Sequence, residues 1–99
     1  MSKLDTLMRE IAKLYFVALR NINFQSFNSD SNYSPFKKYY SDVELAFSQL
    51  DEEKRRIITK EYFYDDYRNW WVNEYKPTRF NRLKKIAAKE FVEVFYAIH

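Results

Sequence analysis

Residues 77–95 have the sequence PTRFNRLKKIAAKEFVEVF and contain the clearest helical pattern in the chain. Apolar residues recur there in steps of three and four, the spacing that places side chains on one face of an α-helix. Pro77 suits the first helical position, where its missing N–H would have no partner in any case. We therefore expect an amphipathic helix that begins close to Pro77. The residues expected on its apolar face are Phe80, Leu83, Ala87, Phe91, Val94 and Phe95.

The same segment carries a concentrated positive charge. Between Lys76 and Glu90 there are six cations and one anion, whereas the whole chain has a formal net charge of +3. Arg can pair with guanine, Asn with adenine, and Lys or Thr with phosphate oxygens, so this charge predicts a DNA-binding surface. The alternative is that the cations form only the solvated face of an amphipathic helix. The residues that we expect to contact DNA are Lys76, Thr78, Arg79, Asn81, Arg82, Lys85 and Lys89.

The N-terminal half predicts two helices joined by a loop. Apolar residues at helical spacing predict a long helix over about Lys3–Ile22. Residues 23–34 are rich in Asn, Ser and Asp, whose side chains compete for backbone hydrogen bonds, so we expect a loop there. Ser41 and Glu44 match a capping box, which predicts a short second helix over about Asp42–Gln49.

Two further helices are expected between residues 50 and 76. Asp51 is a suitable N-cap, and the acidic residues that follow it would lie in the first turn, where the helix dipole favours anions. This third helix should run to about Phe63. Asp65 and Asp66 offer a cap for a short fourth helix, which would end at a turn near residues 73–76.

The composition supports an all-α protein. The chain has 99 residues, of which 46% are hydrophobic and 20% aromatic, enough for one core. It has no glycine and only two prolines, which disfavours hairpin turns and therefore sheets. We predict a compact bundle of about five helices with a C-terminal helix-turn-helix.

The composition also disfavours several classes of function. With no cysteine and no apolar run long enough for a signal peptide or a membrane span, we expect a cytoplasmic protein that is not bound to a membrane. The only histidine is His99, at the chain end, and there is no glycine-rich phosphate loop or Cys/His metal spacing. We therefore expect a protein that is not an enzyme and that uses no metal or cofactor.

Two runs in the second half resemble region 4 of bacterial sigma factors: LDEEKRRII at residues 50–58 and RFNRLKKIA at residues 79–87. Further residues are similar to the small sigma-like helix-turn-helix proteins of mycoplasmas and phage-type regulators. The resemblance covers roughly residues 50–95 and implies that the last helix enters the major groove of promoter DNA and that RNA polymerase is a further partner. The residues that carry this second similarity are Trp70, Trp71, Tyr75, Thr78, Arg79, Phe80, Arg82, Leu83, Lys84, Ala87, Glu90 and Phe91.

These observations together predict a single helical domain over residues 1–99. Residues 1–49 would provide helical support and a loop, and residues 50–99 a sigma region-4-like helix-turn-helix. The expected function is that of a transcription accessory factor or regulator that docks its basic helix in duplex DNA, with a second copy of the chain as a candidate partner. The alternative is a non-enzymatic interaction adaptor that binds a partner through its N-terminal helix and the aromatic residues of the 23–34 loop.

Overall fold

The computed structural model describes residues 2–25, 35–64 and 68–98, and all regular secondary structure in these ranges is helical. None of the helices in these ranges is both long and apolar enough to span a bilayer. The molecule is elongated, with extents of 50 × 27 × 25 Å. Its elements are α1 (Lys3–Gln25), α2 (Pro35–Ser48), α3 (Glu52–Ile58), the π-helical segment η1 (Thr59–Phe63) and α4 (Pro77–Ile98).

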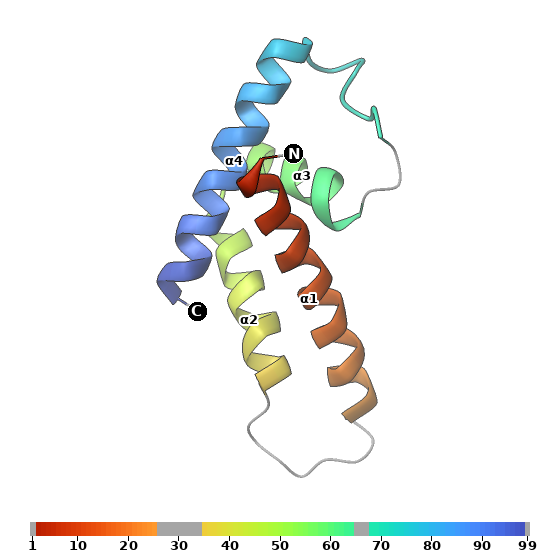
Figure 1. Cartoon of the computed structure of the whole chain (residues 1–99), viewed down its shortest axis with the longest axis vertical. Coiled ribbons are helices and arrows are strands. Elements are labelled where there is room, and N and C mark those ends of the chain that lie inside the picture. The colour runs from red at the N-terminus through yellow and green to blue at the C-terminus, as the bar shows by residue number, and fades with distance from the viewer. Residues whose placement is uncertain (1, 26–34, 65–67, 99) are drawn as a thin grey trace.

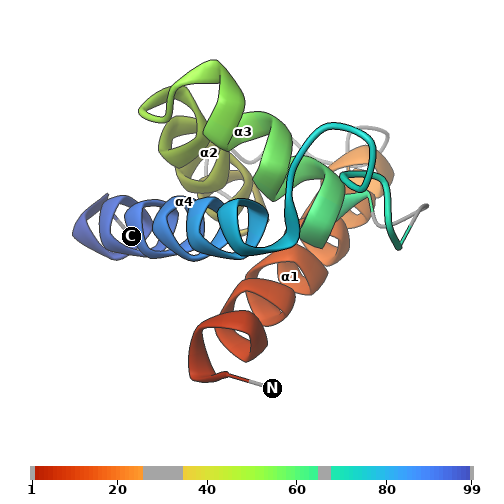
Figure 2. The same ribbon diagram turned by 90° about the horizontal axis from the view of Figure 1, so that it is seen from above.

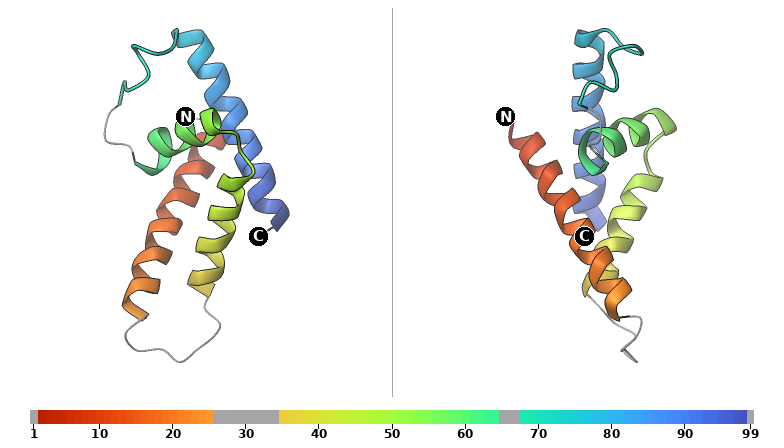
Figure 3. Two further views of the ribbon diagram at one scale, coloured as in Figure 1. Left: turned by 180° about the vertical axis from the view of Figure 1, so that it is seen from behind. Right: turned by 90° about the vertical axis from the view of Figure 1, so that its right-hand side faces the viewer.

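The helices form one bundle. Helices α1 and α2 pack against each other, and α4 packs against both of them and against α3 (Figures 1 and 2). The right-hand view of Figure 3 shows α1 and α2 diverging from the end where the chain connects them. Helix α3 and η1 lie at the wider end of this pair, beside α4. The first turns of α4 lie at the end of the molecule opposite to the last turn of α1 and the first turn of α2.

The core is aromatic and is centred on Phe63. Its ring centroid lies 5.4 Å from that of Tyr15 in α1, 4.9 Å from that of Phe47 in α2 and 6.1 Å from that of Phe91 in α4. All three pairs are edge-to-face, the geometry that aromatic quadrupoles favour. Around them lies a buried apolar cluster that includes Met8, Ile11, Ala12, Val43, Ala46, Leu50, Ile58, Tyr62, Ala87, Ala88 and Phe95.

The π-helical segment explains how Phe63 reaches the core. Ile57, Ile58, Tyr62 and Phe63 are all buried, so two buried pairs lie five residues apart. Residues five apart do not share a face of an α-helix, which repeats every ~3.6 residues, but the i→i+5 bonds of a π-helix bring them into line. The Tyr64 N–H accordingly donates to the Thr59 carbonyl at 2.7 Å. The prediction that the third helix runs from Asp51 to about Phe63 is confirmed, although its last turn is π-helical and not α-helical.

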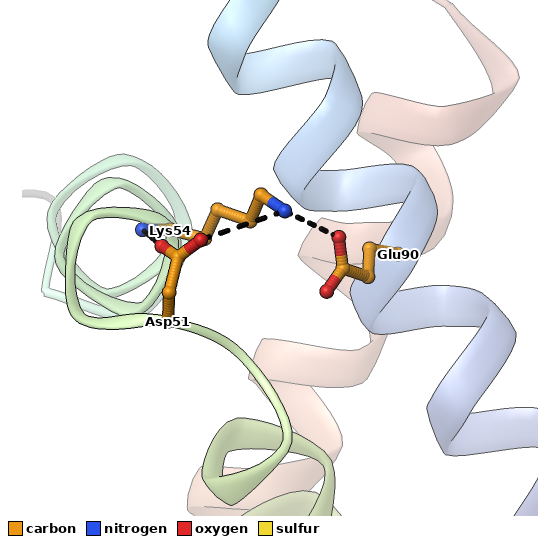
Figure 4. Close-up of polar contacts among 3 residues, drawn as sticks. All are labelled: Asp51, Lys54 and Glu90. Carbon is orange, nitrogen blue, oxygen red and sulfur yellow. Dashed lines mark hydrogen bonds and ion pairs between the residues drawn. The ribbon is translucent and has the colours of Figure 1, made fainter.

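Polar contacts tie α3 to α4 at the start of α3. Asp51 is the N-cap that the sequence predicted, because its Oδ1 accepts from the Lys54 N–H at 2.9 Å. The Lys54 ammonium lies 2.6 Å from Glu90 Oε2 of α4 and 3.6 Å from Asp51 Oδ2 (Figure 4). The hydrogen bond to Glu90 raises the pKa of Lys54 above its ordinary value.

Two tyrosines connect α1 to its neighbours. The Tyr15 hydroxyl donates to Glu44 Oε1 of α2 at 2.7 Å, and the Tyr62 hydroxyl of η1 donates to Asp5 of α1. Burial, followed by the adjacent carboxylate, raises the pKa of both tyrosines well above the ordinary value. Each hydroxyl therefore remains a donor at neutral pH and holds its carboxylate.

The long first helix is confirmed, and it continues to Gln25 rather than ending near Ile22. The Asn21 amide donates back to the Val17 carbonyl at 2.8 Å, so this side chain bonds within the helix instead of terminating it. Most of the loop predicted over residues 23–34 lies outside the described residues.

The second helix begins earlier than the sequence predicted. It starts at Pro35, a good first residue for a helix, and not near Asp42. Ser41 and Glu44 lie inside the helix, so the predicted capping box is wrong. The earlier start brings Tyr39 against the core, where its ring lies 5.5 Å from that of Phe95.

The fourth helix predicted from sequence is not formed in its described part. Residues 68–74 make consecutive turns, and Asp65 and Asp66 lie outside the described residues. From these turns Trp70 and Trp71 both contact Phe80 of α4. The described part of the chain therefore contains four α-helices rather than about five, and the helix that would precede the turn of a helix-turn-helix is replaced by turns.

Replacing the central ring tests its role. Phe63→Ala is expected to lower the free energy of unfolding by about 3–5 kcal/mol, because it removes buried apolar surface and leaves a cavity. Urea denaturation followed by far-UV circular dichroism measures the change. Tyr64→Ala removes the adjacent ring, which is 54% exposed, and should cost under about 1 kcal/mol. Equal losses in the two variants would contradict the central role of Phe63.

The buried tyrosine hydroxyls predict an alkaline limit to stability. A group whose pKa is raised in the folded state stabilises fully below its unfolded pKa, which for tyrosine is about 10, and this contribution is lost as the pH rises further. Denaturation midpoints should therefore fall more steeply above pH ~10 in the wild type than in Tyr62→Phe. Parallel pH profiles in the two proteins would show that Tyr62 ionisation does not limit stability.

Candidate nucleic-acid interface

All seven residues predicted to contact DNA are exposed, and they lie on α4 or immediately before it. We call them the basic surface of α4. The helix repeat places Thr78, Arg82, Lys85 and Lys89 in one line, because they are spaced by four, three and four residues. Arg79 lies to one side of this line. The full set is Lys76, Thr78, Arg79, Asn81, Arg82, Lys85 and Lys89.

The cations of this surface are not neutralised by the protein. None of them makes an ion pair with another described residue. Lys84 differs from them, because its side chain is 24% exposed and its ammonium lies 3.7 Å from Glu61 of η1. The structure thus divides the six cations between Lys76 and Lys89 into one that is paired with an acid and five that are exposed and make no ion pair with a described residue. The five unpaired cations are Lys76, Arg79, Arg82, Lys85 and Lys89.

The start of α4 is also open to an anion. Its first turn contains no acidic residue, and the Phe80 N–H closes the first helical bond to the Lys76 carbonyl at 2.9 Å. Pro77 has no N–H, so Thr78 and Arg79 provide the N–H groups that lack a partner within the helix. Such groups, with the positive end of the helix dipole, favour a phosphate.

A second aromatic cluster anchors this projecting end of α4. Phe80, which is 1% exposed, stacks on Trp71 with a centroid distance of 4.5 Å and an angle of 6° between the rings. Trp70 meets the same ring edge-on at 5.5 Å, and Tyr75 lies 5.8 Å away. The turns at residues 68–75 therefore cover the apolar face of α4 at Phe80, while the residues of the basic surface stay exposed.

Trp70 connects the turns at residues 68–75 to α3 and η1. Its indole N–H donates to Glu61 at 2.8 Å, and the Arg56 guanidinium and Lys60 ammonium lie over its ring, 5.2 Å and 5.1 Å from the centroid. Arg56 also donates to both carboxylate oxygens of Glu74, at 2.6 Å and 2.8 Å. We call these five residues the Trp70 cluster.

The Trp70 cluster was not predicted from the sequence. The Glu61 carboxylate contacts both Trp70 and Lys84 and so joins the turns at residues 68–75 to α4. The Glu61 side chain is 12% exposed. Tyr75 adds a bond to Glu53 at 3.1 Å. A pair of tryptophans between two charged segments was the only sequence signal for such an arrangement, and it does not show which charges surround the indole.

The exposed groups of the basic surface are guanidinium, ammonium, amide and hydroxyl groups, all of which hydrogen-bond to phosphates or base edges. Among the described residues, no group of three or more His, Cys, Asp or Glu could hold a metal ion. Comparisons with protein-family models, with curated proteins and with solved structures find no match for this chain. Its function therefore has to be inferred from its own residues.

The Trp70 cluster makes a testable contribution to stability. Trp70→Ala is expected to lower the free energy of unfolding by about 2–3 kcal/mol, because the ring packs on Phe80 and beneath two cations. Trp70→Phe keeps a ring but loses the bond to Glu61, and should cost about 1 kcal/mol. Val72→Ala is the control, since Val72 lies in the same turns and is 54% exposed. If Trp70→Ala were no more destabilised in urea than this control, the cluster would not anchor α4.

Proposed function

We propose that the protein is a DNA-binding transcription accessory factor or regulator that holds duplex DNA on the basic surface of α4. One observation carries the proposal: the five exposed cations of the basic surface, which extends from Lys76 to Lys89, make no ion pair with any described residue. A helix face that is merely solvated commonly mixes charges of both signs at i, i+4 spacing. Here no acidic residue occurs between Lys76 and Lys89.

Two kinds of contact would contribute to binding. The five cations and the free N–H groups at the start of α4 would hold phosphates, which gives an affinity that does not depend on sequence and falls with salt. Arg79, Asn81 and Arg82 also have the donors and acceptors that pair with base edges in the major groove. Sequence preference would therefore come from these three side chains.

The role in transcription is supported by the resemblance of residues 50–95 to sigma region 4. In this proposal the turns at residues 68–75 take the place of the first helix of a helix-turn-helix, and α4 is the recognition helix. RNA polymerase and a second copy of the chain are the protein partners that accompany this role, and the cytoplasm is its location.

The interaction-adaptor alternative has less support. It requires exposed apolar surface on α1. Among the large hydrophobic side chains of α1 whose exposure is described, only Leu14 is exposed, at 41%. A helix that docks in a partner groove needs several such anchors in register. The aromatic loop that this alternative also uses falls mostly outside the described residues.

Salt-dependent binding to duplex DNA tests the proposed function. Fluorescence anisotropy with a mixed-sequence labelled duplex should show binding whose logarithmic salt slope is about −4.5 if all five cations contact phosphate. Arg79→Ala/Arg82→Ala should weaken binding and reduce the slope by about 2. Both residues are exposed, so the helical content should not change.

The matched control is Arg20→Ala/Lys37→Ala, which removes the same charge. These exposed residues lie near the end of α1 and the start of α2, at the other end of the molecule (Figure 1). Their loss should leave the slope unchanged. Absence of binding at low salt would refute the proposal, and equal weakening in both double variants would show that net charge alone is responsible.

A further inference from the structure

A cleft of about 340 Å³ opens where α1, α2, α3 and η1 meet, away from the basic surface of α4. We call it the Arg55 cleft. One lining residue comes from α1 and the others are spread over residues 44–64, so no short motif could have predicted it. The residues that matter for its chemistry are Tyr15, Glu44, Phe47, Arg55, Phe63 and Tyr64.

The floor of the Arg55 cleft is aromatic and preformed. Phe47 and Phe63 meet at 4.9 Å and 66°, and Tyr15 meets Phe63 at 5.4 Å and 75°. Because Phe63 and Tyr15 are also buried core residues, the packing of the bundle holds these rings in place. A ligand ring entering the cleft would meet a rigid apolar surface without ordering it first.

The cleft is lined by one charge of each sign, the Glu44 carboxylate and the Arg55 guanidinium, and of these two only Glu44 has a hydrogen-bond partner within the cleft. The Tyr15 hydroxyl donates to Glu44, and burial followed by this carboxylate raises the pKa of Tyr15, so the two groups satisfy each other at neutral pH. Arg55 is exposed and makes no ion pair with another described residue. Its guanidinium has the planar geometry that binds a carboxylate through two parallel hydrogen bonds.

We infer that the Arg55 cleft binds a small aromatic carboxylate, with its ring on Phe47 and Phe63 and its carboxylate on the Arg55 guanidinium. Ligand sites usually measure about 300–1,000 Å³, so this cleft suits one ring with a short acidic arm. The site goes beyond the proposed DNA-binding function, because none of its residues belongs to the basic surface of α4.

The surroundings favour a small molecule over a docked protein helix. A partner helix needs a groove with several apolar anchors in register. Of the large exposed hydrophobic side chains in the described part of the chain, only Tyr64 lines the cleft. The others, Leu14, Leu45, Val72, Ile86 and Tyr96, lie on other parts of the surface.

The experiment titrates the full-length, ¹⁵N-labelled protein with 3-phenylpropionate and follows the amide resonances by NMR. Saturable shifts centred on residues around the cleft are expected, with a dissociation constant on the order of 1 mM, as is usual for a ligand of this size. Arg55→Gln should weaken binding about tenfold because it removes the charged partner of the carboxylate. Arg20→Gln, the same change at an exposed arginine on α1 that does not line the cleft, should leave binding unchanged.

A neutral analogue completes the test. 3-Phenylpropionamide has the same ring and arm without the charge, so it should bind the wild type about tenfold more weakly than the acid. Equal binding of acid and amide, or of acid to wild type and Arg55→Gln, would overturn the inference and indicate an apolar docking site for a protein side chain instead. The inference would also be overturned if 3-phenylpropionate gave no saturable shifts at a ligand concentration about ten times the expected dissociation constant. None of these results depends on whether the protein binds DNA.

Discussion

The ring of Phe63 contacts Tyr15 of α1, Phe47 of α2 and Phe91 of α4, and so connects three helices at one point in the core. It can do this only because the chain leaves α-helical geometry at Thr59 and adds a π turn. A π-helix has poorer backbone geometry than an α-helix, so aromatic burial has to compensate for it. The same packing that closes the core also forms the floor of the Arg55 cleft.

The projecting end of α4 depends on a different set of contacts. Phe80 is buried by the turns that precede α4 rather than by the main core, and Trp70 fastens those turns to α3 and η1. An amphipathic helix usually buries its apolar face against another helix. In α4 this holds from Ala87 onward, whereas Phe80 in the first turn is covered by two tryptophans and a tyrosine, and the side chains of the basic surface stay exposed. This exposure is what makes the basic surface of α4 accessible to a ligand as large as a DNA duplex.

The charged residues of α4 are of two kinds: some form ion pairs with other helices, and others remain exposed without one in the described part of the chain. Lys84 and Glu90 each contact an oppositely charged residue of α3 or η1, at 3.7 Å and 2.6 Å, so they hold the bundle together. The five cations of the basic surface make no such pair with a described residue. Exposed pairs contribute little to stability, so unpaired cations are tolerated at small cost and retain their attraction for a polyanion.

Local patterns in the sequence were sufficient to predict the all-helical class, the helices α1, α3 and α4, and the Asp51 N-cap. They also predicted that the seven residues of the basic surface are exposed. Each of these depends on neighbours within about one helical turn, which periodicity and capping chemistry describe well. Other features depended on partners far away in the chain. The π turn places Phe63 against rings of three other helices. The turns at residues 68–75 place Trp70 and Trp71 on Phe80. Tertiary packing also decides that Lys84 is the paired lysine of α4 and that Phe47, Arg55 and Phe63 line one cleft. These residues become neighbours because the helices bury their apolar faces together, and local spacing in the sequence does not describe that.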